Sequence, residues 1–181
     1  MIIAEALDRL IEGTSVDITV YNRQGVASPK TTTIQFHYGD NRELNKWIKE
    51  RGKFNIKYPL VWYVINPYRE TLDGYKSVET QLIIFNDTDL EFLNDIKALR
   101  IYEGIIEPTW QKVKKLLERN KYISVMGSYP DKYIIKDEPA SRLMGVATSR
   151  PNPNNKDYAE AIDLLDKRVI ELKLRIKTDC I

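Results

Sequence analysis

Strict alternation of apolar and charged residues near the C-terminal end is the feature that most constrains the fold. The apolar members are Ile170, Leu172, Leu174 and Ile176, and the charged members between and after them are Glu171, Lys173, Arg175 and Lys177. Successive side chains of a β-strand point to opposite faces, so this period of two is typical of a strand with one wet face. The sequence therefore predicts a half-exposed strand as the last element.

Two apolar runs predict the middle of the sheet. Residues 60–65 form a continuous apolar run between Pro59 and the turn pair Asn66-Pro67, which is typical of a strand covered on both faces. Residues 82–85 form a second run of the same kind. A loop containing Asp73-Gly74 separates the two runs, so we expect them to pair antiparallel.

Alternation also predicts a β-hairpin near the N-terminus. Residues 16–20 and 34–38 both alternate apolar and polar side chains, on either side of a break at Gly25 and Pro29. We expect these two segments to pair with each other and to leave one face wet. His37 has the polar parity of the second segment, which predicts a solvated strand residue.

Helical spacing of apolar residues predicts two short helices. The first occupies the N-terminal residues and ends at Gly13. The second is more polar, is capped by Asp40 or Asn41, and ends at Gly52. Both patterns have a single apolar side, so each helix should pack on one face only.

The longest helical pattern runs from Leu90 to Leu117. Thr88 and Glu91 have the spacing of a capping box, in which each side chain bonds the other's backbone N–H. Pro108 lies inside the pattern and removes a helix hydrogen bond. We therefore expect a helix that starts after Thr88 and has a kink or a short break before Pro108.

The remaining residues complete a single domain, 1–181. Residues 122–126 are expected to form a strand, and residues 127–156 a long polar arm or hairpin with a small apolar island at 133–135. Neither a repeat nor a linker divides the chain. The sequence predicts an α+β fold in which a mostly antiparallel sheet of about five or six strands carries helices packed on one face, plus the extended arm.

Composition excludes several kinds of chemistry. The chain has one cysteine, Cys180, and one histidine, His37, so a disulfide framework and the usual zinc ligand sets are excluded within one chain. It contains neither a Walker loop nor a G-x-G-x-x-G motif. The net charge of +2 is far from that of a dedicated nucleic-acid binder. The acidic start and the short apolar runs predict a soluble protein that is neither secreted nor bound to a membrane.

One pattern suggests catalysis on nucleic acid. Pro130-Asp131 precedes Glu171-Leu172-Lys173, and this order resembles the PD…ExK arrangement of restriction-type nucleases. Two carboxylates would then hold a divalent metal, and the lysine would lie near the scissile phosphate. The competing interpretation is a turn residue followed by the exposed face of a strand. Basic residues cluster at 112–121 and 168–177, where solvated faces explain them as well as a DNA passage does.

Three short motifs follow one another along the chain: residues 57–62 (Lys-Tyr-Pro-Leu-Val-Trp), 86–88 (Asn-Asp-Thr) and 106–110 (Ile-Glu-Pro-Thr-Trp). Together with the order of the elements, they resemble the tail-terminator and neck-completion family of tailed bacteriophages. The resemblance implies a small α+β virion subunit, assembled in the bacterial cytoplasm, that closes into a homo-oligomeric ring at the head–tail junction or tail end.

That resemblance further implies that the protein is not an enzyme and needs no cofactor or metal. The expected partners are other neck, portal or tail proteins, and passive contact with DNA in the lumen is compatible with it. The interface candidates are Tyr133, Ile134, Ile135 and Arg142, in the polar arm. A metal-dependent nuclease and a soluble adaptor or assembly protein stay open as alternatives.

Overall fold

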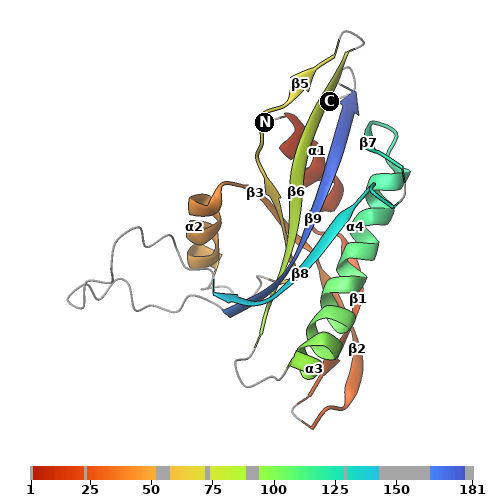
Figure 1. Ribbon diagram of the computed structural model, residues 1–181. Helices are drawn as coiled ribbons and strands as arrows, with labels where there is room; N and C mark the ends of the chain where they lie inside the picture. The colour runs from red at the N-terminus through yellow and green to blue at the C-terminus, as the bar shows by residue number, and fades with distance from the viewer. Residues whose placement is uncertain are drawn as a thin grey trace, which may run out of the picture.

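The computed structural model describes an α+β protein (Figure 1). The described residues are 2–22, 24–51, 58–71, 74–88, 94–128, 130–142 and 164–177. The helices are α1 (Ile2–Ile11), α2 (Asn41–Arg51), α3 (Asn94–Lys97), the π-helix η2 (Ala98–Ile106) and α4 (Glu107–Arg119). The strands are β1 (Ser15–Tyr21), β2 (Ala27–Thr33), β3 (Gln35–Gly39), β4 (Leu60–Val64), β5 (Arg69–Glu70), β6 (Tyr75–Asp87), β7 (Ile123–Met126), β8 (Ile134–Arg142) and β9 (Leu164–Lys177).

The long antiparallel pair β6–β9 forms the centre of the large sheet. β4 and β5 follow one another along the outer edge of β6, and β8 and β7 do the same along β9. The predicted antiparallel pairing of the two apolar runs is confirmed, because Leu60 lies opposite Phe85. β3 joins β4 in parallel and completes a sheet of seven described strands.

The predicted N-terminal hairpin is wrong in its second strand. β1 pairs with the polar segment β2, from Ser15 opposite Thr33 to Tyr21 opposite Ala27, and forms a separate two-stranded ribbon. β3 turns away from this ribbon into the large sheet. There it buries Phe36 in the main core, which a two-stranded ribbon could not enclose.

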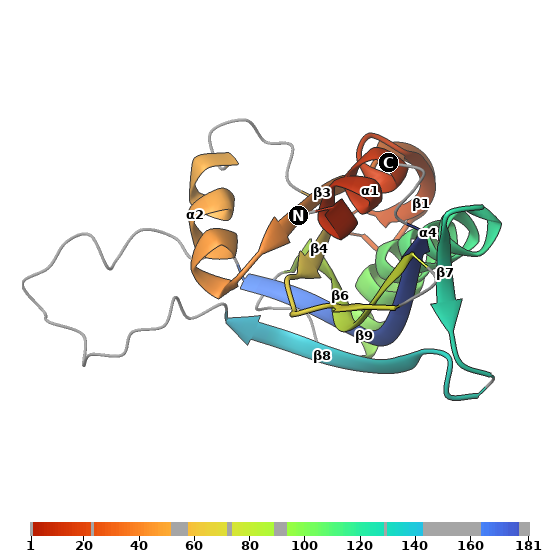
Figure 2. The ribbon, with the colours of Figure 1, turned by 90° about the horizontal axis from the view of Figure 1, so that it is seen from above.

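Helices cover both faces of the large sheet, not one. Side chains of β4 alternate: Val61 and Tyr63 lie in the core beneath α1, η2 and α4, whereas Leu60 and Trp62 lie in a second core beneath α2. Figure 2 shows α2 standing apart from α1 and α4. An amphipathic pattern shows that a helix packs on one side, but it does not specify the face of the sheet. α2 therefore corrects the prediction of a single covered face.

The start of α2 is fixed by Asp40, one of the two residues that the sequence indicated. The Asp40 carboxylate accepts hydrogen bonds from the backbone N–H groups of Arg42, at 2.7 Å, and Glu43, at 2.9 Å. The Glu43 carboxylate accepts one from the N–H of Asp40 at 2.7 Å, which completes a capping box. The N–H groups of Glu43 and Arg42 hold the pKa of Asp40 below its usual value.

The expected break before Pro108 is a π-helix. η2 and α4 follow one another directly, and Pro108, which has no N–H to donate, lies in the first turn of α4. Gly104 in η2 lies against the ribbon: a Cβ there would be 2.6 Å from the carbonyl oxygen of Thr19 in β1. Glycine thus permits close contact between helix and ribbon. Glu91, the expected capping-box partner of Thr88, lies outside the described residues.

The predicted arm contributes a strand to the sheet. Residues 134–142 form β8, which pairs antiparallel with β9 and has an irregularity between Glu138 and Ser141. Residues 143–163 lie outside the described part of the chain. Within the part that is described, no helix is long and apolar enough to cross a membrane.

Candidate functional site

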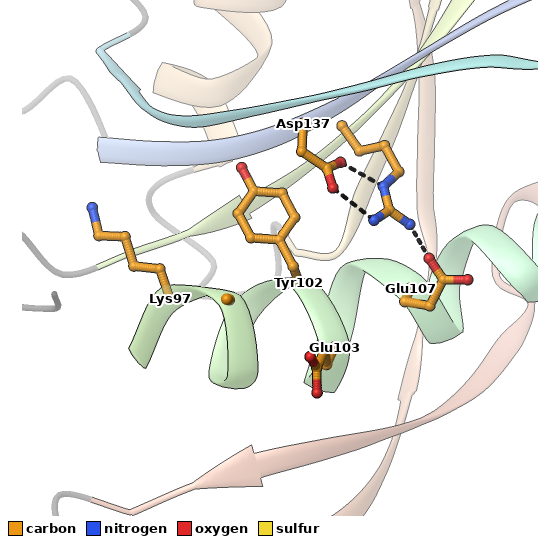
Figure 3. Close-up of a pocket in the computed structure, with 7 residues that line it drawn as sticks. Lys97, Tyr102, Glu103, Glu107 and Asp137 are labelled. Carbon is orange, nitrogen blue, oxygen red and sulfur yellow. Dashed lines mark hydrogen bonds and ion pairs between the residues drawn. The ribbon is translucent and has the colours of Figure 1, made fainter. Parts of the chain in front are cut away.

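A buried arginine is the centre of the most elaborate polar cluster (Figure 3). Arg168 in β9 donates to both carboxylate oxygens of Asp137 in β8, with Nε–Oδ1 at 2.6 Å and Nη2–Oδ2 at 2.9 Å. Its Nη1 donates to Glu107 in the first turn of α4. Burial alone would lower the pKa of Arg168, but the hydrogen bonds to Asp137 and Glu107 raise it. The three nitrogens of the guanidinium are therefore all engaged.

This cluster corrects the prediction that the basic residues near the C-terminal end form a solvated face. Only 8% of Arg168 is exposed. The residue has the parity of Ile170 and Leu172, which face the main core, and not that of Lys173. The alternation in the sequence already placed Arg168 on the same face of the strand as Ile170 and Leu172. Arg168 ties β8, β9 and α4 together.

Tyr102 of η2 lies beside the arginine cluster. Burial, together with the nearby carboxylates of Asp166 and Asp137, raises its pKa far above the usual value. Its hydroxyl donates to the carbonyl oxygen of Lys167 at 3.3 Å. Tyr102 and Arg168 line a hollow of about 440 Å³ together with Lys97, Ala98, Glu103, Glu107 and Asp137. Through these hydrogen bonds the cluster forms a clamp that ties η2 and α4 to β8 and β9.

A second hollow lies on the half of the sheet face that α2 leaves uncovered. This groove has a volume of about 610 Å³ and lies where β7 ends and β8 begins. Its lining residues include Val64, Met126 and Ile134, which are apolar, and Glu79, Gln81, Asp131, Glu171 and Lys173, which are polar. Four of its charges are in ion pairs: Lys173 with Glu79 at 3.1 Å, Glu171 with Lys136 at 2.8 Å, and Lys132 with Glu118 at 3.7 Å.

The groove brings together the three residues of the PD…ExK pattern. Asp131 lies in the turn before β8, and Glu171 and Lys173 lie on β9. The Glu171 carboxylate already accepts a hydrogen bond from Lys136. Across the described residues, no group of three or more His, Cys, Asp or Glu side chains could hold a metal ion.

The four residues expected at an interface lie in different environments. Tyr133 is buried: its ring meets Trp110 edge-on at 5.1 Å, and its hydroxyl donates to Glu118 at 3.1 Å. It therefore anchors the start of β8 in the core and is not an exposed contact. Ile134 and Ile135 are 48% and 45% exposed. Arg142 pairs with Leu164 through the backbone of β8 and β9.

His37 is not a solvated strand residue as predicted. Its ring lies 5.8 Å from that of Trp47 in α2 and 5.4 Å from that of Trp62 in β4. The residue is half-buried because α2 folds over this end of the sheet. Its polar parity was assigned correctly, but that face of the strand is covered.

No protein-family model matches the chain, and no curated protein matches it significantly. The functional proposal therefore depends on the residues and geometry described above.

Proposed function

We propose that the protein is a structural subunit of a phage virion, which closes into a ring in the neck or at the tail end through contacts between neighbouring copies. The observation that supports this most is the placement of exposed apolar side chains. Val26, at the turn of the β1–β2 ribbon, is 59% exposed, and Ile134 and Met126, beside the groove, are 48% and 36% exposed. The ribbon and the groove lie on different elements.

Two different surfaces with exposed apolar side chains on one chain suit a head-to-tail contact between copies. When such a contact repeats with a rotation that closes, it generates a ring. The buried arginine clamp supports the same function, because Arg168 ties β8, β9 and α4 into one body through three hydrogen bonds. Neighbouring neck, portal or tail proteins would bind the faces of the ring, and DNA would pass through its lumen.

Native mass spectrometry over a concentration series tests this function, together with a search for the chain in purified particles. We expect a closed oligomer of one defined size, or a monomer that is present in multiple copies in the particle. A chain that stays monomeric and is missing from finished particles would refute the proposal. That result would favour an adaptor or assembly protein, which binds only transiently.

A metal-dependent nuclease is the second candidate, favoured by one observation. Asp131, Glu171 and Lys173 line the same groove although Asp131 is far from the other two in sequence. Cleavage of DNA with Mg²⁺ or Mn²⁺, lost in Asp131→Ala and in Glu171→Ala, would support it. Absence of cleavage with either metal would eliminate this candidate and leave the ring proposal intact.

A further inference from the structure

The open edges of the sheets carry features that block pairing with another strand. Within the described residues β2 pairs only with β1, and β8 only with β9. Each strand contains a proline, Pro29 or Pro139, which has no N–H to donate. In β3, the N–H of Phe36 already donates to the Glu12 carboxylate. Prolines and inward-pointing charges are common protections of edge strands. Contacts between copies should therefore use side chains rather than strand addition.

The tip of the β1–β2 ribbon is an ordered projection. Asn22 closes its turn: the N–H of Val26 donates to the Asn22 side-chain oxygen at 2.9 Å, and the N–H of Gly25 to the Asn22 carbonyl at 3.0 Å. Val26 follows this turn and is the most exposed large apolar residue among those described. β1 fixes the ribbon to the core through Val16 and Ile18, which are buried. The hydrogen-bonded turn therefore holds the apolar side chain of Val26 in solvent at an ordered position.

The groove has the volume and the exposed apolar side chains needed to accept the ribbon tip, and it lies at the other end of the molecule from that tip. In Figure 1, the continuous helix made of α3, η2 and α4 extends from near the ribbon tip to β7, whose end borders the groove. A volume of about 610 Å³ can accept several side chains. Met126 and Ile134 are partly exposed to solvent beside it. Because the two surfaces lie at opposite ends, one copy cannot fill its own groove with its own tip.

Charge adds a second complementarity. Lys30 on the ribbon is exposed, and so is Asp131 in the groove. Neither residue forms an ion pair within the described residues, whereas the other groove acids, Glu79 and Glu171, are already paired. Within the described residues, the ribbon therefore carries one cation, Lys30, and the groove one carboxylate, Asp131, that is not in an ion pair.

We propose that the occupant of the groove is a second copy of this chain, whose ribbon tip places Val26 against Met126 and Ile134. Lys30 of the incoming ribbon lies toward Asp131 in the same contact. The inference rests on the proposed ring function and specifies which two surfaces build the ring. It replaces strand addition at a sheet edge, which the prolines and the Glu12 carboxylate oppose.

Ile135 provides a matched control for the groove. It follows Ile134 in β8 and has nearly the same exposure, 45% against 48%. Ile134 lies opposite Glu171, on the groove side of the sheet, whereas Ile135 lies opposite Ile170, on the other side. A substitution at Ile135 therefore changes the same type of residue outside the proposed contact.

The first experiment is native mass spectrometry of Val26→Asp, Ile134→Asp and Ile135→Asp beside the wild type, with circular dichroism to confirm folding. We expect the first two variants to raise the concentration for half-assembly about tenfold or more, because each places a charge in an apolar contact. Ile135→Asp should assemble like the wild type. Lys30→Glu and Asp131→Lys should each weaken assembly, and the two together should restore it.

The second experiment maps the contact directly. In a Cys180→Ser background, Val26→Cys and Ile134→Cys proteins are mixed and oxidised, and the cross-linked peptides are identified. A 26–134 disulfide between copies is expected, and none when Ile135→Cys replaces Ile134→Cys. A wild-type ring that persists in Val26→Asp without this cross-link overturns the inference alone. A wild type that never self-associates and is missing from particles overturns the proposed function as well.

Discussion

Replacing Arg168 with methionine tests whether the buried guanidinium holds β8 to the core. Methionine keeps most of the apolar stem and removes the three hydrogen bonds to Asp137 and Glu107. Loss of one partner of a fully buried ion pair costs about 3–5 kcal/mol. Here the side chains of Asp137 and Glu107 are 41% and 42% exposed and can regain water, so the cost should be smaller. We expect Arg168→Met to lower the free energy of unfolding by about 2–3 kcal/mol.

Urea unfolding followed by circular dichroism measures this loss. For a slope of about 2 kcal/mol/M, the midpoint should fall by about 1–1.5 M. Lys173→Met is the control, because Lys173 is also on β9 but is 45% exposed and bonds a Glu79 side chain that is 80% exposed. An exposed pair of that kind contributes about 0.2–1 kcal/mol. Equal losses in the two variants would refute the assignment of Arg168 as the clamp.

Two further predictions concern the ribbon and the cap of α2. Gly104→Ala should lower the thermal midpoint, because its Cβ would lie 2.6 Å from the Thr19 oxygen, and overpacking costs about 1–3 kcal/mol. A raised midpoint, as for glycine to alanine in an ordinary helix, would contradict the close contact. Hydrogen bonds from Glu43 and Arg42 lower the pKa of Asp40, so its charge stabilises the fold above its usual pKa of 3.8 and ceases to do so as pH falls through the lowered value. Asp40→Asn should therefore be less stable than wild type in urea at neutral pH, and this difference should shrink in strong acid. An unchanged difference at both pH values would contradict the role of the charge.

The elements that could be predicted from sequence are those whose burial leaves a periodic pattern. β4, β9 and α2 carry such patterns, and each forms near its predicted position. β2 and β8 do not, because the described side chains of both strands are mostly exposed and each strand contains a proline, which are also properties of loops. The pairing of β1 with β2 was missed for this reason. Arg168 differs, because its parity with Ile170 placed it on the core face, but its charge favoured a solvated interpretation.

Groove residues illustrate a second limit. Asp131 and Glu171 could be paired from a motif, but no sequence pattern indicates that Val64 and Met126 would lie beside them. That juxtaposition depends on β7 and β8 sharing one edge of β9, in registers that no local signal specifies. The half-buried position of His37 could not be predicted for the same reason, since it depends on which face of the sheet α2 occupies.

The geometry between ribbon and groove would determine whether copies close into a ring. Ribbon and groove are connected through η2 and α4, with Gly104 setting the approach of β1 at one end and Trp110 packing on Tyr133 at the other. A rigid connection fixes the rotation from each copy to the next, and a fixed rotation is what distinguishes a closed ring from an open filament. A side chain at position 104 would displace β1 and change that rotation. On the proposed contact, Gly104→Ala should therefore alter the size of the oligomer as well as its stability, whereas Arg168→Met should weaken the subunit and leave the number of copies unchanged.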